Sequence, residues 1–381
     1  MSPEPRPGRL LLVAGPATGG IGSHVAGLAT GLPALGWSVT VFTSPLTAAR
    51  FGLGDRVVTG WPAGLVSLLP AVRTLRRLIR GADVVHAHGH QAGLITVLTA
   101  ATLWPARRPV LVVSWHNAIL GAGPRRRLLA LAEIVQVRAA TLVTGACADL
   151  VDRARALGAR TARLAAVAAP AAVAVSRADE TAGDRLLDSL IPLKRGQEHG
   201  PVVLTVSRIA AQKRLDVLVE AAAGLSRRIP GLRWLVAGDG DAVLLAKLER
   251  QAAALGAPVT FLGVRKDIPV LMAAADVFAL TSDWEARALV VQEAMAAGLT
   301  VVATEVGGLP DLLAETDQLE PAGLLVPPGD AAAFTAAVEL ALTDRDLAAG
   351  LARSARERFA GLPTEDDVVQ AWSRDYAELI G

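Results

Sequence analysis

The sequence is poor in cysteine, in aromatic residues and in net charge, and each shortage excludes a class of protein or partner. Among 381 residues there is one cysteine, Cys147, so an internal disulfide framework is excluded and a reducing compartment is expected. Aromatic residues make up 4% of the chain, so its cores must be built mainly from alanine, valine and leucine. The formal net charge of +2 is too small to indicate nucleic acid as a partner.

Long apolar runs are also missing. Although 52% of the residues are hydrophobic, no uncharged run reaches the length of about 18 residues that a membrane-spanning helix needs. The first residues, MSPEPRPGR, are broken by prolines, and the apolar LLLVAG that follows is only as long as a strand, so no secretory signal is predicted. We therefore expect a cytoplasmic protein.

The length and the order of apolar runs indicate two α/β domains. A chain of 381 residues suits two domains of about 180 residues each. Apolar, β-rich runs alternate with amphipathic helical stretches, which is typical of doubly wound parallel sheets. This alternation fails between residues 165 and 200, which we interpret as the connection, so the expected domains are 1–180 and 181–363.

The expected strands are short apolar segments spread over both halves. They cover residues 9–15, 38–44, 82–88, 109–116 and 141–145, and then 201–207, 233–238, 259–263, 276–280, 300–304 and 323–327. The last segment, TEDDVVQAWSRDYAELIG, predicts a helix over 364–381 that begins at a capping Thr364 and carries Trp372 and Tyr376 on one face.

The segment SDWEARALVVQEAMAAG, residues 282–298, is the most informative part of the chain. It places two carboxylates, Glu285 and Glu293, eight positions apart between a strand and the next strand of a βαβ crossover. Eight helical residues rise about 12 Å, roughly the distance from the sugar to the ribose of an extended nucleotide diphosphate sugar. Open α/β folds bind ligands at the carboxyl edge of the sheet. The spacing therefore predicts that this segment holds a nucleotide sugar at both ends.

A glycine-rich loop, TGGIGSHV, follows the first strand. Gly19, Gly20 and Gly22 allow a sharp turn and a close approach to a ligand, and the N-terminus of the next helix suits a phosphate or a polar acceptor group. A dinucleotide-binding loop is one alternative, but it needs an acidic residue after the second strand, where Thr43 and Ser44 stand. A purely structural turn is another.

Two further loops carry charge. In SRIAAQKRLD, Arg208 and Lys213 lie between a strand and a helix, where both cations can reach a diphosphate, although a solvated basic loop would look the same. The triplet Asp239-Gly240-Asp241 has the form of a short acidic motif that can hold a divalent metal. Because it opens a helix, we interpret Asp241 as an N-cap and predict no metal site.

These motifs occur in the order typical of one family. In register are TGGIGSHV, HAHG, SWHN, SRIAAQKR, AGDG, the paired-glutamate segment and VGGLPDLL. The chain thus resembles the retaining glycosyltransferases of family 4, of the glycogen synthase and PimA-like superfamily, over nearly its whole length. The resemblance implies the GT-B fold, in which two Rossmann-like domains face each other across a cleft, and a last helix, 364–381, that packs back on the N-terminal domain.

The resemblance also implies an activity: a retaining hexosyltransferase that moves a sugar from a nucleotide diphosphate donor, with UDP or GDP, to an acceptor hydroxyl group. The family works without a bound metal or other cofactor. Glu285 then contacts the sugar and Glu293 the ribose. The implied donor-binding residues are Gly20, Arg208, Lys213, Val264, Ala288, Leu289, Val290 and Glu293.

Histidines supply the remaining candidates. His116 ends a strand, and the resemblance implies that it touches the donor sugar and stabilises developing charge, so it joins Glu285 as a catalytic candidate; a buried core histidine is the alternative. Of His86 and His88, we expect one to face the cleft and the other to pack in the core. His24 and His88 are acceptor-side candidates.

The chain departs from the family pattern in two places that matter. Many relatives have glycine and then a large apolar residue after the first glutamate, where this chain has Ala286 and Arg287, so the identity of the sugar stays open. A protein that binds a nucleotide sugar without transferring it, or an NAD-dependent oxidoreductase, are alternatives. The sequence does not predict whether the acceptor is a small molecule, a glycan or a lipid-linked compound. It does not predict the oligomeric state either.

Basic strips occur in the N-terminal half. Residues 73–83 and 123–140 combine arginines with apolar helical positions. Such a strip is either a solvated face or a peripheral contact with an anionic membrane, at the inner face for a cytoplasmic protein.

Overall fold

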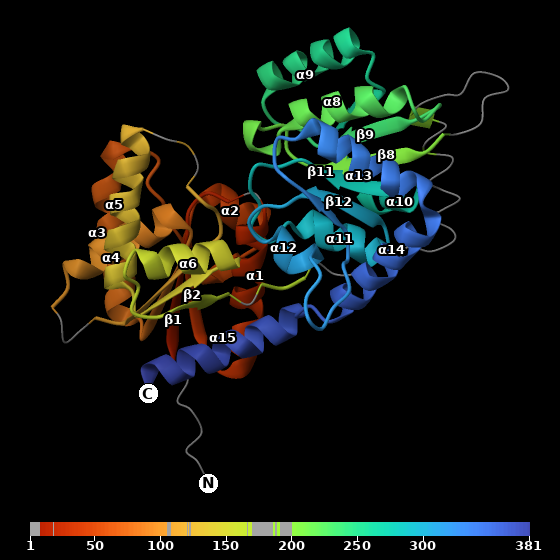
Figure 1. Ribbon diagram of the computed structural model, residues 1–381. Helices are drawn as coiled ribbons and strands as arrows, with labels where there is room; N and C mark the ends of the chain where they lie inside the picture. Colours follow the sequence, from red (N-terminus) through yellow and green to blue (C-terminus); the bar gives the residue numbers. More distant parts are fainter. Residues whose placement is uncertain are drawn as a thin grey trace. The chain divides into compact units, whose positions relative to one another are not determined.

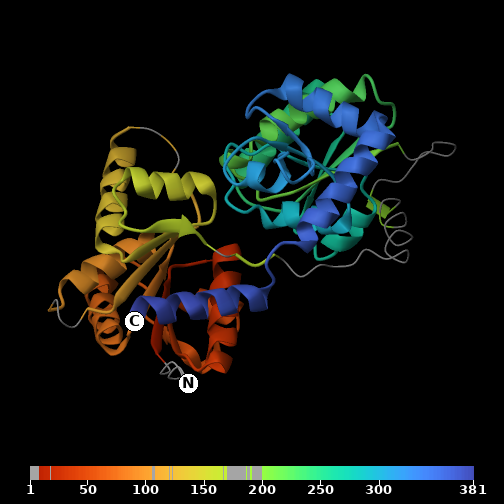
Figure 2. The same ribbon diagram turned by 60° about the horizontal axis from the view of Figure 1, so that its bottom comes forward.

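The chain folds into two compact units (Figures 1 and 2). The computed structural model describes residues 8–17, 19–104, 108–119, 121, 123–165, 167–169, 186, 189–190 and 200–381. Unit 1 consists of Met1–Ala168 and Pro363–Gly381, and unit 2 of Ala169–Leu362. Within the described residues, no helix is both long and apolar enough to cross a membrane.

Unit 1 is a parallel sheet covered by helices on both faces. Its strands follow the order β3-β2-β1-β4-β5-β6-β7, and every neighbouring pair is parallel. Its elements are β1 (Arg9–Ala14), α1 (Gly20–Gly31), η1 (Leu32–Leu35), β2 (Ser38–Thr43), α2 (Pro45–Arg50), η2 (Gly54–Arg56), β3 (Val57–Thr59), α3 (Leu65–Gly81), β4 (Val84–His88), α4 (His90–Ala101), β5 (Val110–Trp115), α5 (Pro124–Ala139), β6 (Leu142–Gly145), α6 (Ala148–Ala156), β7 (Ala162–Leu164) and α15 (Glu365–Ile380).

The last helix of the chain, α15, belongs to unit 1. Its N-terminus is a capping box in which the Thr364 hydroxyl accepts from the Asp367 N–H and the Asp367 carboxylate accepts from the Thr364 N–H. Trp372 and Tyr376 are buried on one face, with ring centroids 5.3 Å apart, and they join the core formed with α1, η1 and β1. Burial of two large rings anchors the helix to the sheet.

Unit 2 repeats the same architecture. Its parallel sheet has the order β10-β9-β8-β11-β12-β13. Its elements are β8 (Val202–Val206), η4 (Ala211–Lys213), α8 (Leu215–Ser226), β9 (Arg233–Ala237), α9 (Ala242–Leu255), β10 (Val259–Gly263), α10 (Ile268–Ala273), β11 (Val277–Leu280), α11 (Leu289–Ala297), β12 (Thr300–Thr304), α12 (Leu309–Leu313), β13 (Leu324–Val326), α13 (Ala331–Thr343) and α14 (Arg345–Ala360).

The cores of unit 2 lie on the two faces of its sheet. Alternate residues of one strand serve different clusters: Leu204 packs with α11 and α14, whereas Val203 packs with α8 and α13. A strand buried on both faces needs a continuous apolar sequence rather than an alternating one. This explains why VVLTV and RWLVA were readable as strands.

All eleven expected strands are present, which confirms the α/β class with two doubly wound parallel sheets. Two strands, β3 and β7, were not expected. Each has three residues and lies at an edge of the sheet of unit 1, where little apolar burial is needed. The expected region of irregular sequence between residues 165 and 200 lies largely outside the described residues.

Candidate functional site

In unit 2, two loops at the carboxyl edge of the sheet are bound to each other. The Thr281 hydroxyl donates to the carbonyl of Lys213 over 2.9 Å, and the Asp283 N–H donates to the carbonyl of Gln212 over 2.8 Å. The Gln212 side-chain amide in turn donates to the carbonyl of Trp284 over 2.5 Å. The loop after β8 and the loop after β11 therefore hold a fixed relative position.

Glu285 lies at the centre of this junction and is 8% exposed. Its Oε1 accepts hydrogen bonds from the Nζ of Lys213 and, over 2.5 Å, from the Ser282 hydroxyl. Within the described residues nothing donates to Oε2, and Lys213 uses one of its three N–H donors in this contact. The pair can therefore accept from a ligand at the carboxylate and donate to it at the ammonium group.

The backbone of Glu285 is fixed as well. Its carbonyl accepts from the N–H of Gly308 over 2.9 Å. Gly307 has φ +56°, and a Cβ at this position would lie 1.9 Å from the same carbonyl oxygen. Only glycine allows this close approach. The segment VGG after β12 thus positions Glu285, a role that sequence analysis did not assign to it.

The helix α11 begins later than the sequence suggested. Its first residue is Leu289, so Glu285 lies in the preceding loop, and the helical rise of about 12 Å between the two carboxylates does not apply. The N-cap, Ala288, has φ +31° and ψ +65°, and no side chain caps the helix. The N–H groups of Val291 and Gln292 reach the carbonyl of Ala288, so those of the residues before them remain available to an anion.

Three other predicted donor residues lie around this edge. Glu293 is half-buried in α11, and burial raises the pKa of its carboxyl group. Arg208 is exposed after β8. In the described part of the chain, no acceptor pairs with the guanidinium of Arg208, and no donor pairs with the carboxylate of Glu293. Val264 follows β10 and is 68% exposed. All three lie at the carboxyl edge expected for ligands of such a sheet.

Asp241 acts as a helix cap. Its Oδ1 accepts from the N–H groups of Val243 and Leu244 over 2.9 and 3.0 Å, and it is the N-cap of α9. This confirms its predicted structural role. Across the described ranges, no group of three or more His, Cys, Asp or Glu side chains has the arrangement of a metal site.

In unit 1, four histidines meet where β4 and β5 end. The ring centroid of His88 lies 3.9 Å from that of His86, 5.4 Å from that of His24 and 5.6 Å from that of His116. The Nδ1 of His88 lies 3.3 Å from the Nε2 of His116. The structure thus brings the three candidate histidines of unit 1 together, and it adds His86 to them.

The prediction that His86 and His88 face opposite ways is wrong. They are two positions apart on β4, and side chains alternate along a strand with a period of two, so both point to the same face. Both are buried, at 0% and 2% exposure.

A chain of polar contacts holds His86. Its Nδ1 lies 2.6 Å from the Tyr376 hydroxyl on α15, and its Nε2 lies 2.6 Å from the Ser114 hydroxyl, which is 2.5 Å from that of Thr144. The ring of Trp372 lies 4.4 Å away. Both nitrogens of His86 therefore have partners, and α15 is tied to the middle of the sheet. The sequence did not predict the contacts of Ser114 and Tyr376 with a histidine; their polarity in apolar surroundings was the only signal of them.

The four histidines are neutral near pH 7. Burial lowers the pKa of His24 to about 4, and burial together with the neighbouring His24 and His90 lowers the pKa of His116 to about 3. Burial also holds the pKa values of His86 and His88 well below the ordinary range. Among the described residues, nothing pairs with the buried Nε2 atoms of His24 and His88, so both can bind a polar group of a ligand.

The glycine loop leads into α1. Gly19 has φ −137°, and neither Gly20 nor Gly22 has a positive φ, so no left-handed backbone conformation requires glycine at these three positions. A Cβ on Gly22 would lie 2.1 Å from the ring of Phe51, so packing requires glycine there. No side chain caps α1, whose first residue is Gly20. Anion binding at this end stays a prediction.

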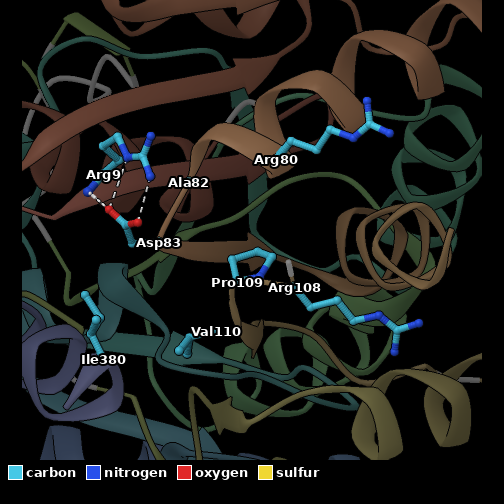
Figure 3. A pocket seen from close by; sticks show the side chains of 8 residues that line it. All are labelled: Arg9, Arg80, Ala82, Asp83, Arg108, Pro109, Val110 and Ile380. Atoms are coloured by element: carbon cyan, nitrogen blue, oxygen red, sulfur yellow. Dashed lines mark hydrogen bonds and ion pairs between the residues drawn. The ribbon is translucent and has the colours of Figure 1, made fainter. Parts of the chain in front are cut away.

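A cavity of about 460 Å³ lies elsewhere in unit 1 (Figure 3). It is lined by residues at the amino ends of β1, β4 and β5, among them Arg9, Asp83 and Val110. The Arg9 guanidinium donates to the Asp83 carboxylate over 2.9 Å, so these opposite charges already satisfy each other. Because ligands of open α/β sheets bind at the carboxyl ends of strands, this cavity is not the candidate site.

Two family models match the chain. The model of glycosyl transferases group 1 matches residues 193–358, and the model of the glycosyl transferase 4-like domain matches residues 19–170. Every candidate site residue falls within one of these two ranges.

Curated proteins are similar to the chain in sequence, and a solved structure is similar to it in fold. The sulfoquinovosyl transferase SQD2 of Arabidopsis thaliana is 33% identical over 169 residues, which cover 44% of this chain but only 31% of that protein. The D-inositol 3-phosphate glycosyltransferase of Salinispora arenicola is 34% identical over 324 residues, which cover 78% of this chain and 67% of that protein. HepE of Anabaena, crystallised with UDP and glucose, has a TM-score of 0.78 and 21% identity, with 97% of this chain and 100% of HepE covered.

Proposed function

Because the chain belongs to the group 1 glycosyl transferases and has the GT-B fold, we propose that it transfers a sugar from a nucleotide diphosphate donor to an acceptor hydroxyl group, with retention of the anomeric configuration. The observation that carries the proposal is the contact between Lys213 and Glu285 beside the uncapped start of α11. It sets a carboxylate, a cation and free backbone N–H groups at one edge of unit 2.

The diphosphate is the part of the donor that needs positive charge. Lys213 has two unused N–H donors, and Arg208 is exposed and unpaired within the described residues. The free N–H groups at Ala288, Leu289 and Val290 add the positive end of the α11 dipole. Together they would neutralise the leaving diphosphate without a resident metal.

The rings of the donor need acceptors and an apolar contact. The free Oε2 of Glu285 would accept from hydroxyl groups of the sugar, and the unpaired carboxylate of Glu293 would accept from the ribose. The exposed side chain of Val264 would lie against the base. Arg287, half-buried in the same loop, has its carbonyl fixed by the Gln292 amide over 2.7 Å and would help to select the sugar.

Unit 1 would supply the catalytic histidine and the acceptor side. His116, which is neutral, can donate one hydrogen bond to the donor sugar, while the unpaired Nε2 atoms of His24 and His88 would bind hydroxyl groups of the acceptor. Gly20, at the start of α1, would approach the donor phosphate.

The chemical step exchanges one bond at the anomeric carbon. The bond from this carbon to the diphosphate oxygen breaks, and the acceptor oxygen forms the new bond on the same face of the sugar. The acceptor proton would pass to the departing diphosphate oxygen. Charge on the leaving group would be held by Lys213 and the α11 N-terminus.

The proposal is tested in two stages. In the first, a thermal-shift screen compares UDP, GDP, their sugars and NAD; a ligand at 100 times its Kd stabilises the protein by about 2.7 kcal/mol. We expect a UDP or GDP sugar to give the largest shift, whereas NAD alone would point to an oxidoreductase. The crystallised complex of HepE makes UDP the first choice.

The second stage measures transfer with the donor so identified, over acceptors that include small molecules, glycans and lipid-linked compounds. We expect a product whose anomeric configuration, measured by NMR, equals that of the donor. An inverted product would contradict retention. Donor binding without turnover over the whole panel would mean that the protein only binds nucleotide sugars.

A further inference from the structure

One segment of the chain, residues 57–148, is strongly basic although the chain as a whole is nearly neutral. The chain has 38 basic and 36 acidic residues, but residues 57–148 contain ten arginines, no lysine and only two acidic residues, Asp83 and Glu133. Asp83 is bound by Arg9, and Glu133, 2% exposed, is bound by Arg153, by His90 and, over 3.5 Å, by Arg126. Arg126 is thus the only one of these arginines that pairs with an acidic residue of the segment, within the residues that the structure describes.

The helix α3 sorts these residues by face. Its inner stripe, Ala71, Leu75 and Ile79, is buried at 3% exposure or less. The opposite stripe consists of exposed residues at helical spacing: Val66, Leu69, Arg73, Arg77 and Arg80. Val66 and Leu69 are 96% and 65% exposed. The outer face of α3 therefore starts apolar and continues basic, and the helix has no acidic residue.

The helix α5 shows the same combination. Its outer stripe carries Leu128, Leu131 and Val135, which are 67%, 59% and 42% exposed, with the exposed Arg127 and Arg138 at either side. Two large apolar side chains on successive helical turns do not gain from exposure to water. Such a stripe needs an apolar partner next to an anionic one.

Both stripes belong to one layer of helices. The connections from β3 to β4, from β4 to β5 and from β5 to β6 run in one direction across the sheet, so right-handed crossovers put α3, α4 and α5 on the same face. The helix α4 contacts both α3 and α5, and the views show the three side by side (Figures 1 and 2). Near the end of α4, Leu98 and Trp104 are 53% and 77% exposed.

We propose that the layer α3–α5 docks on the surface of an anionic lipid bilayer. The exposed aliphatic residues and Trp104 enter the boundary between headgroups and acyl chains, and the arginines bind lipid phosphates. A nucleic acid would match the arginines but not the aliphatic residues between them. This inference concerns helices of unit 1, whereas the candidate donor residues belong to unit 2, and it does not depend on the proposed function.

The test is flotation of the full chain with vesicles of phosphatidylcholine alone or mixed with phosphatidylglycerol. We expect binding to the anionic vesicles only. The variant Arg73→Glu/Arg77→Glu should reduce this binding by roughly fivefold or more for each charge. The variant Leu69→Ser/Leu131→Ser should bind at low salt but detach at high salt, because only the electrostatic part remains.

Matched controls come from unit 2, where Val243 is 80% exposed and Arg353 is exposed. Val243→Ser/Arg353→Glu should bind anionic vesicles like the unaltered protein. Circular dichroism and the UDP and GDP thermal shift, measured on every variant, show that the fold and the donor site are intact. A variant that loses vesicle binding but keeps its nucleotide thermal shift has lost docking alone. A variant that loses both has a damaged fold or donor site.

Trp104 gives a second readout. On binding to anionic vesicles its fluorescence should move to shorter wavelength and be quenched by brominated lipids, and Trp104→Leu should remove most of this change. The proposal is overturned by absence of flotation, by equal binding to neutral vesicles, or by an equal loss in the control variant. Tight binding of DNA or RNA that the Leu69→Ser/Leu131→Ser variant retains would also overturn it.

Discussion

Lys213 donates a hydrogen bond from its Nζ to Oε1 of Glu285, joining the loop after β8 to the loop after β11. The two residues are 72 positions apart in the sequence. Both side chains are largely buried, at 13% and 11% side-chain exposure, so the contact is less screened by water than a surface ion pair. It makes these two loops, which carry the candidate donor-binding residues, a single structural unit.

Replacing Lys213 should therefore affect both stability and binding. Lys213→Ala leaves the buried Glu285 carboxylate with Ser282 as its donor, so the free energy of unfolding of unit 2 should fall by about 1 to 3 kcal/mol. The Kd for UDP or GDP, measured by calorimetry, should rise about tenfold or more. The control is Arg228→Ala, which breaks the more exposed Arg228–Glu339 pair and should cost less than about 1 kcal/mol. Equal effects of both substitutions on the Kd would contradict a role in binding.

Gly307 should be irreplaceable because of the carbonyl of Glu285. In Gly307→Ala the new Cβ would lie 1.9 Å from that oxygen, so the loop must move and transfer activity should fall by about 100-fold or more. Gly256→Ala is the matched control: its φ of +63° is similar to the +56° of Gly307, but nothing lies within 4 Å of the added Cβ. Both variants share the backbone strain, so only the first should lose activity. Similar activity in the two would mean that Glu285 need not be held in place.

Ala288 stores strain at the start of α11. Only it and Arg214 have a positive φ among the non-glycine residues that the structure describes. Ala288→Gly should remove this strain and leave the free energy of unfolding unchanged or raised by up to about 1 kcal/mol. Ala296→Gly, in the last turn of the same helix, should lower it by up to about 1 kcal/mol. Urea denaturation measures both, and an equal loss in the two variants would show that Ala288 is not strained.

Acid should destabilise unit 1. The folded-state pKa values of His24 and His116 lie at about 4 and about 3, below the ordinary value of 6.5, so between these limits the unfolded state binds more protons. The free energy of unfolding must then fall as the pH falls, by about 1.4 kcal/mol per pH unit for each such histidine. Urea denaturation from pH 7 to about pH 4.5 should show this slope, and His116→Gln should reduce it. An unchanged slope in the variant would contradict a neutral, buried His116.

Much of the fold followed from sequence because its strands are buried on both faces. Continuous apolar runs of strand length, such as RLLLVA and VVLTV, are typical of strands in a parallel sheet that helices cover on both faces. The edge strand β7 could not be found, because ARL carries no apolar pattern. The family and the GT-B fold were confirmed, since seven motifs in order carry far more information than any one motif.

The details of the site were less accessible. The positive φ of Ala288 could not be predicted, because this left-handed backbone conformation favours glycine and the sequence has alanine there. The contact of Lys213 with Glu285 is a long-range tertiary contact, so no local sequence pattern predicts it. The error on His86 and His88 had another cause: the period of a strand was misapplied to residues two positions apart. The roles of the individual site residues stay predictions.

A crystal structure of the protein with bound UDP or GDP would show directly whether these residues bind the donor. We expect the diphosphate within about 3 Å of the Lys213 ammonium and the Arg208 guanidinium, with the ribose hydroxyl groups on Glu293. A nucleotide bound away from the carboxyl edge of unit 2, for example in the cavity beside Arg9 and Asp83, would contradict it.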